Sequence, residues 1–312
     1  MTFREKIRVL FSQRLWTVDL SGESKAFSAI VRFVKLMSIT FDTFAQNRMG
    51  FQCVSLSYYI ALAIVPLFAV AFVVTGGLGL TDKLLEFLEQ GLATHPEMID
   101  FIMEKANNII DGAKGGGIGL VSFLLFFWAI LWMMFQVERV FNNVWGIRKI
   151  PRKIYKRFGF YLLVVVLSPF IVLMFGTGIA YYTNMTNLLG LDLSDLRLIT
   201  RILGYITFYV IAVFTMSVMY KYIPAVKIKY SNALKAAVIA GIIFVAFQYL
   251  YLETQVFVGR LNKAYGVVAA IPLFLIWLNF SWQIIIYGAE FCYSLETIDT
   301  YNTQNWDSDI KE

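Results

Sequence analysis

Long apolar stretches alternate with short polar segments along this chain, and the polar segments hold most of its charges. The stretch from residue 267 to residue 289 contains no charged residue and is long enough, as a helix, to cross the hydrocarbon core of a bilayer. Similar stretches precede it at about 52–75, 118–136, 158–182, 199–219 and 233–252. The pattern predicts an all-α integral membrane protein built as a bundle of six transmembrane helices.

The last apolar stretch carries polar residues on one helical face. At 100° per residue, Asn279, Gln283 and Glu290 lie within about 40° of one another. Gly288 and Ala289, next to Glu290, are small residues of the kind that let two membrane helices approach closely. This polar stripe is consistent with hydrogen bonding between helices and equally with the lining of a solute pathway. The sequence leaves both interpretations open.

Residues 1–49 are predicted to form a basic, cytoplasmic N-terminal region. One helical face is apolar, with Arg32 and Lys35 off that face, and its members are Phe27, Ile30, Val31, Val34, Met37, Phe41 and Phe44. The pattern indicates an interfacial amphipathic helix whose basic residues attract the anionic headgroups of membrane lipids. A nucleic-acid-binding arm is the alternative, but the region has no such motif, so we expect no nucleic-acid partner.

The other polar segments complete the predicted domain organisation. Residues 50–294 form the transmembrane domain, in which the acidic segment 81–117 is too polar to span a membrane. We expect this segment to be an external loop with two short helices, near 82–92 and 95–110. Residues 295–312 form a polar, acidic tail that we place in the cytoplasm.

The distribution of Lys and Arg predicts the orientation in the membrane. These residues number eight in 1–49, three in 81–117 and seven in 139–157. Because cytoplasmic segments carry an excess of Lys and Arg, we expect the N- and C-termini to be cytoplasmic. Proline removes a backbone donor from a helix, so kinks are predicted at Pro66, Pro169 and Pro224.

Composition and motifs argue against an enzyme. The mean hydropathy is +0.66 and only 15% of the residues are charged, against about 25% in soluble domains. The chain has one histidine, two cysteines outside any ligand-type cluster, and no phosphate-binding loop or hydrolase motif. We therefore expect no catalytic residues, no metal site and no cofactor.

Several segments resemble the YihY/BrkB family of bacterial inner-membrane proteins, namely SLSYYIALAIVPLF (55–68), ERVFNNVWGIRKIPRKIYKRF (138–158), YKYIPAVKIKYSNALKAAVIAG (220–241) and YGVVAAIPLFLIWLNFSWQIIIYGAEF (265–291). The family pattern falls on Tyr58, Pro66, Asn142, Pro224, Tyr265, Gly266, Gly288, Ala289 and Glu290. The resemblance implies a six-helix, multi-pass protein of the bacterial inner (cytoplasmic) membrane, linked to envelope integrity or resistance to host killing. Members have also been labelled ribonuclease BN, but this chain lacks the clustered ligands of a metal-dependent nuclease.

The candidate functional residues are polar groups expected at membrane depth or at its cytoplasmic edge: Tyr58, Glu138, Arg139, Asn142, Asn279, Gln283 and Glu290. A buried charge needs a partner, so we expect Glu290 to face the bundle interior and to pair with Arg139 or Lys235. Two functions stay open. One is a transporter or channel-like protein for a small solute or a lipid, and the other is a non-catalytic membrane scaffold in envelope assembly.

The predicted orientation is testable by cysteine labelling in intact cells. In a variant without Cys53 and Cys292, a cysteine at position 89 should react with a membrane-impermeant reagent, whereas one at position 308 should react only after the cells are lysed. The opposite labelling pattern would exclude a cytoplasmic C-terminus.

Overall fold

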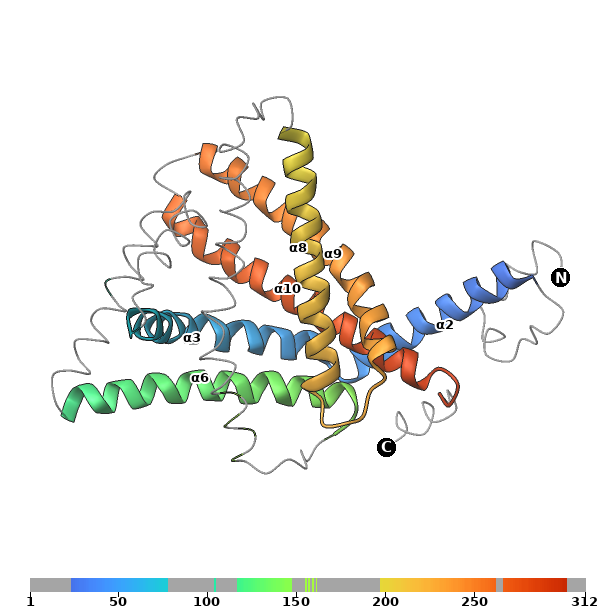
Figure 1. The fold of residues 1–312 in the computed structure, drawn as a ribbon, viewed down its shortest axis with the longest axis horizontal. Coiled ribbons are helices and arrows are strands. Elements are labelled where there is room, and N and C mark those ends of the chain that lie inside the picture. Colours follow the sequence, from blue (N-terminus) through green and yellow to red (C-terminus); the bar gives the residue numbers. More distant parts are fainter. Residues whose placement is uncertain are drawn as a thin grey trace. The chain divides into compact units, whose positions relative to one another are not determined.

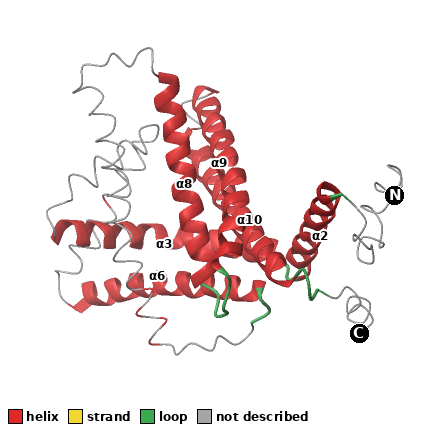
Figure 2. Ribbon diagram, turned by 45° about the vertical axis from the view of Figure 1, so that its right-hand side comes forward, coloured by secondary structure: helices red, strands yellow, loops and turns green. Residues whose placement is uncertain are grey.

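The computed structural model of the chain describes residues 24–77, 117–147, 197–261 and 266–301, together with residues 104, 155, 157, 159 and 161. Every element in this part of the chain is an α-helix and no strand occurs in it (Figure 1, Figure 2). The helices are α2 (Lys25–Gln46), α3 (Met49–Gly77), α6 (Gly117–Val144), α8 (Arg197–Tyr222), α9 (Tyr230–Leu261) and α10 (Gly266–Thr297). The all-α prediction is confirmed for these residues.

Three of the helices are long and apolar enough to cross a membrane. They contain the segments Gly204–Tyr222, Tyr230–Tyr251 and Pro272–Thr297, and a shorter apolar helix covers Met49–Ile64. The predicted third span lies outside the described residues apart from Gly159 and Tyr161, as does the external loop apart from Glu104 and Gly117. A membrane protein is therefore supported, whereas the count of six spans stays a prediction.

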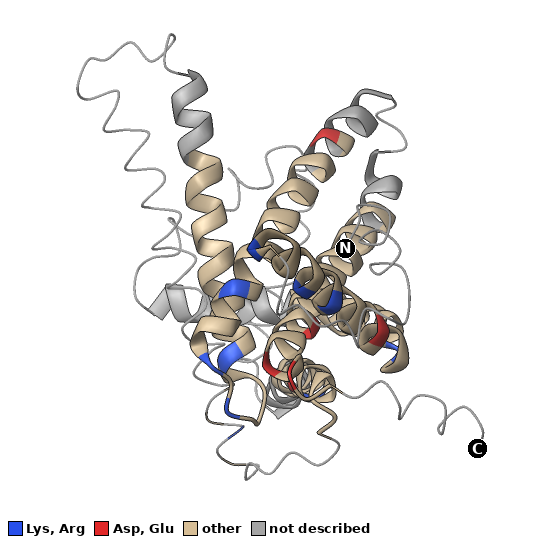
Figure 3. Ribbon diagram, turned by 90° about the vertical axis from the view of Figure 1, so that its right-hand side faces the viewer, with Lys and Arg blue, Asp and Glu red and all other residues tan. Residues whose placement is uncertain are grey.

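The chain divides into two compact units. The first contains Met1–Val54, Val140–Lys149 and Thr207–Glu312, and the second contains Ser55–Arg139 and Ile150–Ile206. Within the first unit, α10 packs against both α9 and α2. Figure 3 shows that the charged residues of α9 lie near the ends of that helix, so most of its length presents uncharged side chains, as a membrane helix requires.

Helix α2 forms where the amphipathic pattern predicts a helix. Its N-cap is Ser24, whose side chain accepts a hydrogen bond from the backbone N–H of Phe27 at 3.3 Å. Only part of the apolar face that is predicted to lie on the membrane is buried in the protein, whereas Ile30 is 50% and Phe41 57% exposed. The buried residues are Phe27, Val31, Leu36, Ile39, Thr40, Thr43 and Phe44.

The contact with α10 accounts for this difference. Phe44 stacks on Tyr287 of α10 with ring centroids 3.7 Å apart, and Phe41 meets the edge of the same ring at 5.7 Å. Two threonines are thus buried against α10 in place of part of the predicted apolar face. The position of α2 at a membrane surface stays a prediction.

The prolines differ in their local structure. Helix α3 continues on both sides of Pro66, and a bend there stays a prediction. Pro224 lies in the connection between α8 and α9, after the end of α8, so the predicted kink within a helix is wrong at this position. Since proline cannot continue a helix easily, Pro224 helps to end α8 instead. Pro169 lies outside the described residues.

A close approach of three helices in the first unit depends on Gly288. A Cβ atom added to Gly288 would lie 2.7 Å from Cβ of Ala240 on α9 and would collide with the phenol of Tyr220 on α8. Tyr220 is fully buried, and its hydroxyl donates to the carbonyl of Ile285 on α10 at 3.0 Å. The small residue allows this large side chain to lie between the helices, as the sequence predicts for a close helix approach.

Replacing Gly288 with alanine should therefore destabilise the protein. We expect Gly288→Ala to lower the free energy of unfolding by about 1–3 kcal/mol through overpacking. Gly204→Ala is the control, because a Cβ atom at Gly204 meets no atom within 4 Å. Thermal unfolding in detergent or nanodiscs measures both variants, and equal effects would contradict the packing described for Gly288.

Candidate functional site

A buried polar cluster lies where α10 packs on α2. Its central group is the carboxyl of Glu290, which is 0% exposed. The Oε1 atom accepts a hydrogen bond from Nδ2 of Asn47 at 3.4 Å. The Oε2 atom is also buried and has no hydrogen-bond partner among the described residues. The prediction that Glu290 faces the interior is confirmed.

Three hydroxyl groups accompany this carboxyl. Each donates to a carbonyl one turn earlier in its own helix: Thr40 to Leu36 at 2.7 Å, Thr43 to Ile39 at 2.8 Å and Ser294 to Glu290 at 2.9 Å. Across the helix contact, the hydroxyl oxygens of Thr40 and Ser294 are 2.9 Å apart. The Thr43 hydroxyl also approaches the Glu290 carboxyl. The cluster is therefore rich in oxygen atoms.

The corner between α2 and α3 fixes the position of Asn47. Its backbone N–H donates to the carbonyl of Thr43 at 2.9 Å, and its carbonyl accepts from the side chain of Gln52 at 2.8 Å. Arg48 follows with a φ of 49°, in the left-handed region that non-glycine residues seldom adopt. Such a conformation persists only where surrounding contacts hold it. The tight corner thus presents the Asn47 amide to the carboxyl.

Neither of the two bases predicted to pair with Glu290 is its partner within the first unit. Lys235, which belongs to the same unit, is exposed on α9 and makes no ion pair with Glu290, so this predicted pairing is wrong. The reason is that α10 buries the carboxyl against α2, where Asn47 reaches it. Arg139 is exposed and belongs to the second unit, and its pairing with Glu290 stays a prediction.

The other polar residues of α10 bond to each other. The side-chain amide of Gln283 donates to Oδ1 of Asn279 at 2.7 Å, one turn apart on the same helix, and both side chains are half-buried. Trp277 donates from Nε1 to the side chain of Gln248 on α9 at 2.9 Å. These contacts satisfy part of the polar stripe, whereas the buried carboxyl of Glu290 has no base as partner among the described residues of its unit.

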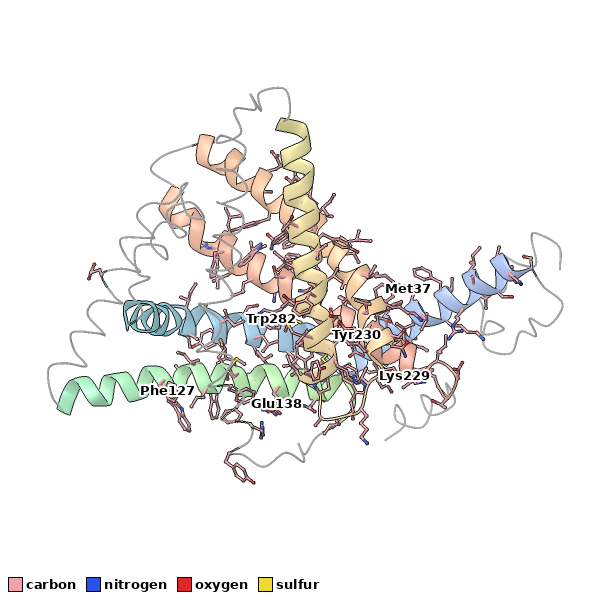
Figure 4. All side chains as sticks on the ribbon, in the orientation of Figure 1. Met37, Phe127, Glu138, Lys229, Tyr230 and Trp282 are labelled. Atoms are coloured by element: carbon pink, nitrogen blue, oxygen red, sulfur yellow. The ribbon has the colours of Figure 1, made fainter. Side chains whose placement is uncertain are left out.

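A second carboxyl cluster lies in the second unit, around Glu138 on α6 (Figure 4). Glu138 is 2% exposed and forms an ion pair with Arg157, with 2.6 Å between Nε and Oε2. The hydroxyl of Tyr161 donates to the same oxygen, and the guanidinium lies 4.8 Å from the ring centre of Phe135. Burial acts to lower the pKa of Arg157, but its hydrogen bonds to Tyr161 and Glu138 outweigh this and raise that pKa above its ordinary value.

Two of the predicted site residues, Asn142 and Tyr58, belong to neither carboxyl cluster. Asn142 is fully buried, and its Oδ1 accepts from the backbone N–H of Ala225 at 2.8 Å, which anchors the connection between α8 and α9. Tyr58 is 60% exposed and meets the edge of the neighbouring Tyr59 ring. The structure does not bring Tyr58 together with other candidate residues.

Sequence reasoning missed Asn47, Thr40, Thr43 and Ser294 in the first cluster, and Arg157 and Tyr161 in the second. The threonines stand three residues apart within an apolar helical face, and that spacing is the one signal that might have drawn attention to them. No group of three or more His, Cys, Asp or Glu side chains occurs among the residues that the structure describes. The absence of a metal site stays a prediction.

Comparison with known proteins gives matches over most of the chain. The sequence model of the family described as virulence factor BrkB matches residues 40–310. A UPF0761 membrane protein of Chlorobium chlorochromatii is 25% identical over 87% of this chain and 61% of its own length. A UPF0761 membrane protein of Aggregatibacter aphrophilus is 23% identical over 84% of this chain and 92% of its own length. A third, from Halorhodospira halophila, is 30% identical over 78% of this chain and 53% of its own length.

The chain thus spans about three fifths of the length of the Chlorobium relative and about half that of the Halorhodospira relative. No solved structure matches it.

The Glu138 cluster predicts an asymmetric response to arginine substitutions. Arg157→Gln should lower the free energy of unfolding by about 3–5 kcal/mol, because it leaves a buried carboxylate without its cation. Arg139→Gln is the matched control, since Arg139 neighbours Glu138 in sequence but is exposed. Thermal unfolding of both variants tests the pair, and an equally large effect of Arg139→Gln would refute it.

Proposed function

The chain belongs to the membrane-protein family described as virulence factor BrkB, and we propose that it is a transporter or channel-like protein for a small solute or a lipid. The proposed location is the bacterial inner membrane, with both termini in the cytoplasm, and the proposed role is in maintaining the cell envelope. We also propose that it is not an enzyme and that the ribonuclease label does not describe its activity.

The observation that carries the transport proposal is the environment of Glu290. This carboxyl is fully buried in a helix that is apolar enough to span a membrane, and no base among the described residues of the first unit pairs with it. Ionisable residues inside membrane helices are costly, and they commonly mark the routes of substrates, ions or protons. A carboxyl that served only to hold two helices together would be expected to pair with a base, as Glu138 pairs with Arg157.

Other polar groups on the same helix support this proposal. Asn279 and Gln283 are half-buried on α10, and Trp277 bonds to Gln248 of α9. Polar side chains are thus present along a large part of α10, on the helix that also carries Glu290. They would provide hydrogen-bonding groups for a polar solute or for a lipid headgroup that crosses the bilayer.

Reconstitution into liposomes tests the transport proposal. Proteoliposomes should release entrapped small solutes or equilibrate fluorescent lipids between leaflets faster than empty liposomes do. Glu290→Gln keeps the size of the side chain and removes its charge, so this variant should stay folded and lose most of the flux. Glu253→Gln, which alters an exposed carboxyl on α9, is the matched control and should retain the flux.

The same experiment addresses the scaffold alternative. A wild-type protein that moves neither solutes nor lipids, although it is folded and correctly inserted, would refute transport and favour a scaffold in envelope assembly. Equal flux through the wild type and Glu290→Gln would show that this carboxyl has no part in transport.

A further inference from the structure

The oxygen atoms around Glu290 outnumber the protons available to them. A hydroxyl group has one proton to donate and two lone pairs that accept. Thr40, Thr43 and Ser294 each direct that proton to a carbonyl of their own helix. The lone pairs of these oxygens are therefore left for the space between the helices. The hydroxyl oxygens of Thr40 and Ser294 are 2.9 Å apart, so one of these two protons is shared between a carbonyl and the other hydroxyl, and neither hydroxyl has a second proton to give to Glu290.

The carboxyl itself has too few donors. Asn47 supplies one hydrogen bond, at 3.4 Å, to Oε1 of Glu290, and buried Oε2 has no partner in the described part of the chain. A carboxylate removed from water in this way costs several kcal/mol unless a proton or a cation neutralises it. The cluster lacks a positive charge and has surplus acceptor atoms.

The titratable residues of the packed elements do not supply that charge. On α10, Tyr293 lies beside Glu290, and on α3, Cys53 is buried. Phenols and thiols are ordinarily uncharged at neutral pH and become negative when they ionise. On α2, Asp42 accepts a hydrogen bond from Ser38, Arg32 is exposed, and Lys35 is not among the groups that act on Glu290. Arg48, in the corner after α2, is exposed. No described residue of the first unit therefore supplies the neutralising charge.

We propose that the cluster formed by Glu290, Thr40, Thr43, Asn47 and Ser294 is a binding site for a small monovalent cation, which is Na⁺ or a proton. Carboxylate, hydroxyl and amide oxygens are the hard ligands that a dehydrated Na⁺ takes, and a proton satisfies the same carboxyl by covalent attachment. The cation neutralises Glu290 between α2 and α10. A role of this cation as the coupling ion of transport rests on the function proposed above. Its binding to the cluster does not depend on transport.

Thermal unfolding of the purified full-length protein tests this site. At constant ionic strength, with choline replacing Na⁺, the melting temperature should rise with the logarithm of the Na⁺ concentration, because a ligand that binds only the folded state stabilises it. Glu290→Gln should abolish this rise, and Thr43→Val should shift it to higher Na⁺ concentrations. Thr254→Val is the matched control, since the Thr254 hydroxyl makes the same bond to its own helix but is exposed on α9.

Infrared spectroscopy distinguishes a proton from Na⁺ as the occupant. If a proton fills the site, Na⁺ has no effect, and the wild type shows the carbonyl band of a protonated carboxylic acid that Glu290→Gln lacks and that raising the pH removes. If Na⁺ fills it, the carboxylate bands shift with Na⁺ in the wild type. Thr43→Val keeps the carboxyl and provides the comparison if Glu290→Gln fails to fold.

Two results would overturn the proposal. One is an ionised Glu290 in a protein whose stability is indifferent to Na⁺, which would mean that water alone satisfies the cluster. The other is an undiminished Na⁺ response in Glu290→Gln, or in Thr43→Val if Glu290→Gln fails to fold. Cation binding without flux in liposomes would refute transport and leave the site intact, whereas flux without cation binding would refute the site alone.

Discussion

A carboxyl group that leaves water must be neutralised or hydrogen-bonded, and this constraint shapes the contact between α2 and α10. The cost of an isolated buried carboxylate exceeds what a few apolar contacts contribute. The face that α2 turns to α10 accordingly includes Thr40 and Thr43 as well as apolar residues, and the helix ends at the residue whose amide reaches Glu290. The stacking of Phe44 on Tyr287 then closes the apolar side of the same contact.

The two buried carboxyl groups show two ways of meeting this constraint. Glu138 obtains a guanidinium and a phenol from nearby positions in the sequence, so its charge is balanced within the protein. Glu290 is surrounded by hydroxyls and one amide, which provide polarity without positive charge. The first arrangement holds a fixed ion pair. The second has no cation among the described residues, and the proposed occupant would supply it.

The features that were predictable from the sequence are those that periodicity encodes. Uncharged stretches identified the helices that are apolar enough to span a membrane, and the stripe that contains Glu290 indicated that this residue faces inward. The small side chain of Gly288 likewise indicated a close approach of helices. Periodicity does not reveal which neighbour a helix packs against, so it could not choose Asn47 over Lys235 as the partner of Glu290.

Hydroxyl groups were harder to recognise. Thr40 and Thr43 satisfy their protons within α2, so they fit an apolar face and do not stand out as polar residues. Arg157 was overlooked for a different reason. It belongs to a run of basic residues after a span, and such a run already indicates orientation in the membrane, whether or not one of its members forms a buried ion pair. Tyr161 lies within an apolar stretch and carried no signal of its own. In each case, the role depends on a three-dimensional neighbour.

The fit of Tyr220 against Gly288 has a consequence for how the first unit can move. Moving α10 by one residue along its helical screw, about 1.5 Å with a rotation of about 100°, would place the side chain of Tyr287 or Ala289 where only a hydrogen atom now fits. This fit therefore favours movement of α9, α10 and the part of α8 in the first unit as one body. The contact between α2 and α10 combines rings packed on Tyr287 with hydroxyls and an amide that can exchange hydrogen-bond partners. We expect the hinge of the unit to lie along this seam, beside the carboxyl whose occupancy would set it.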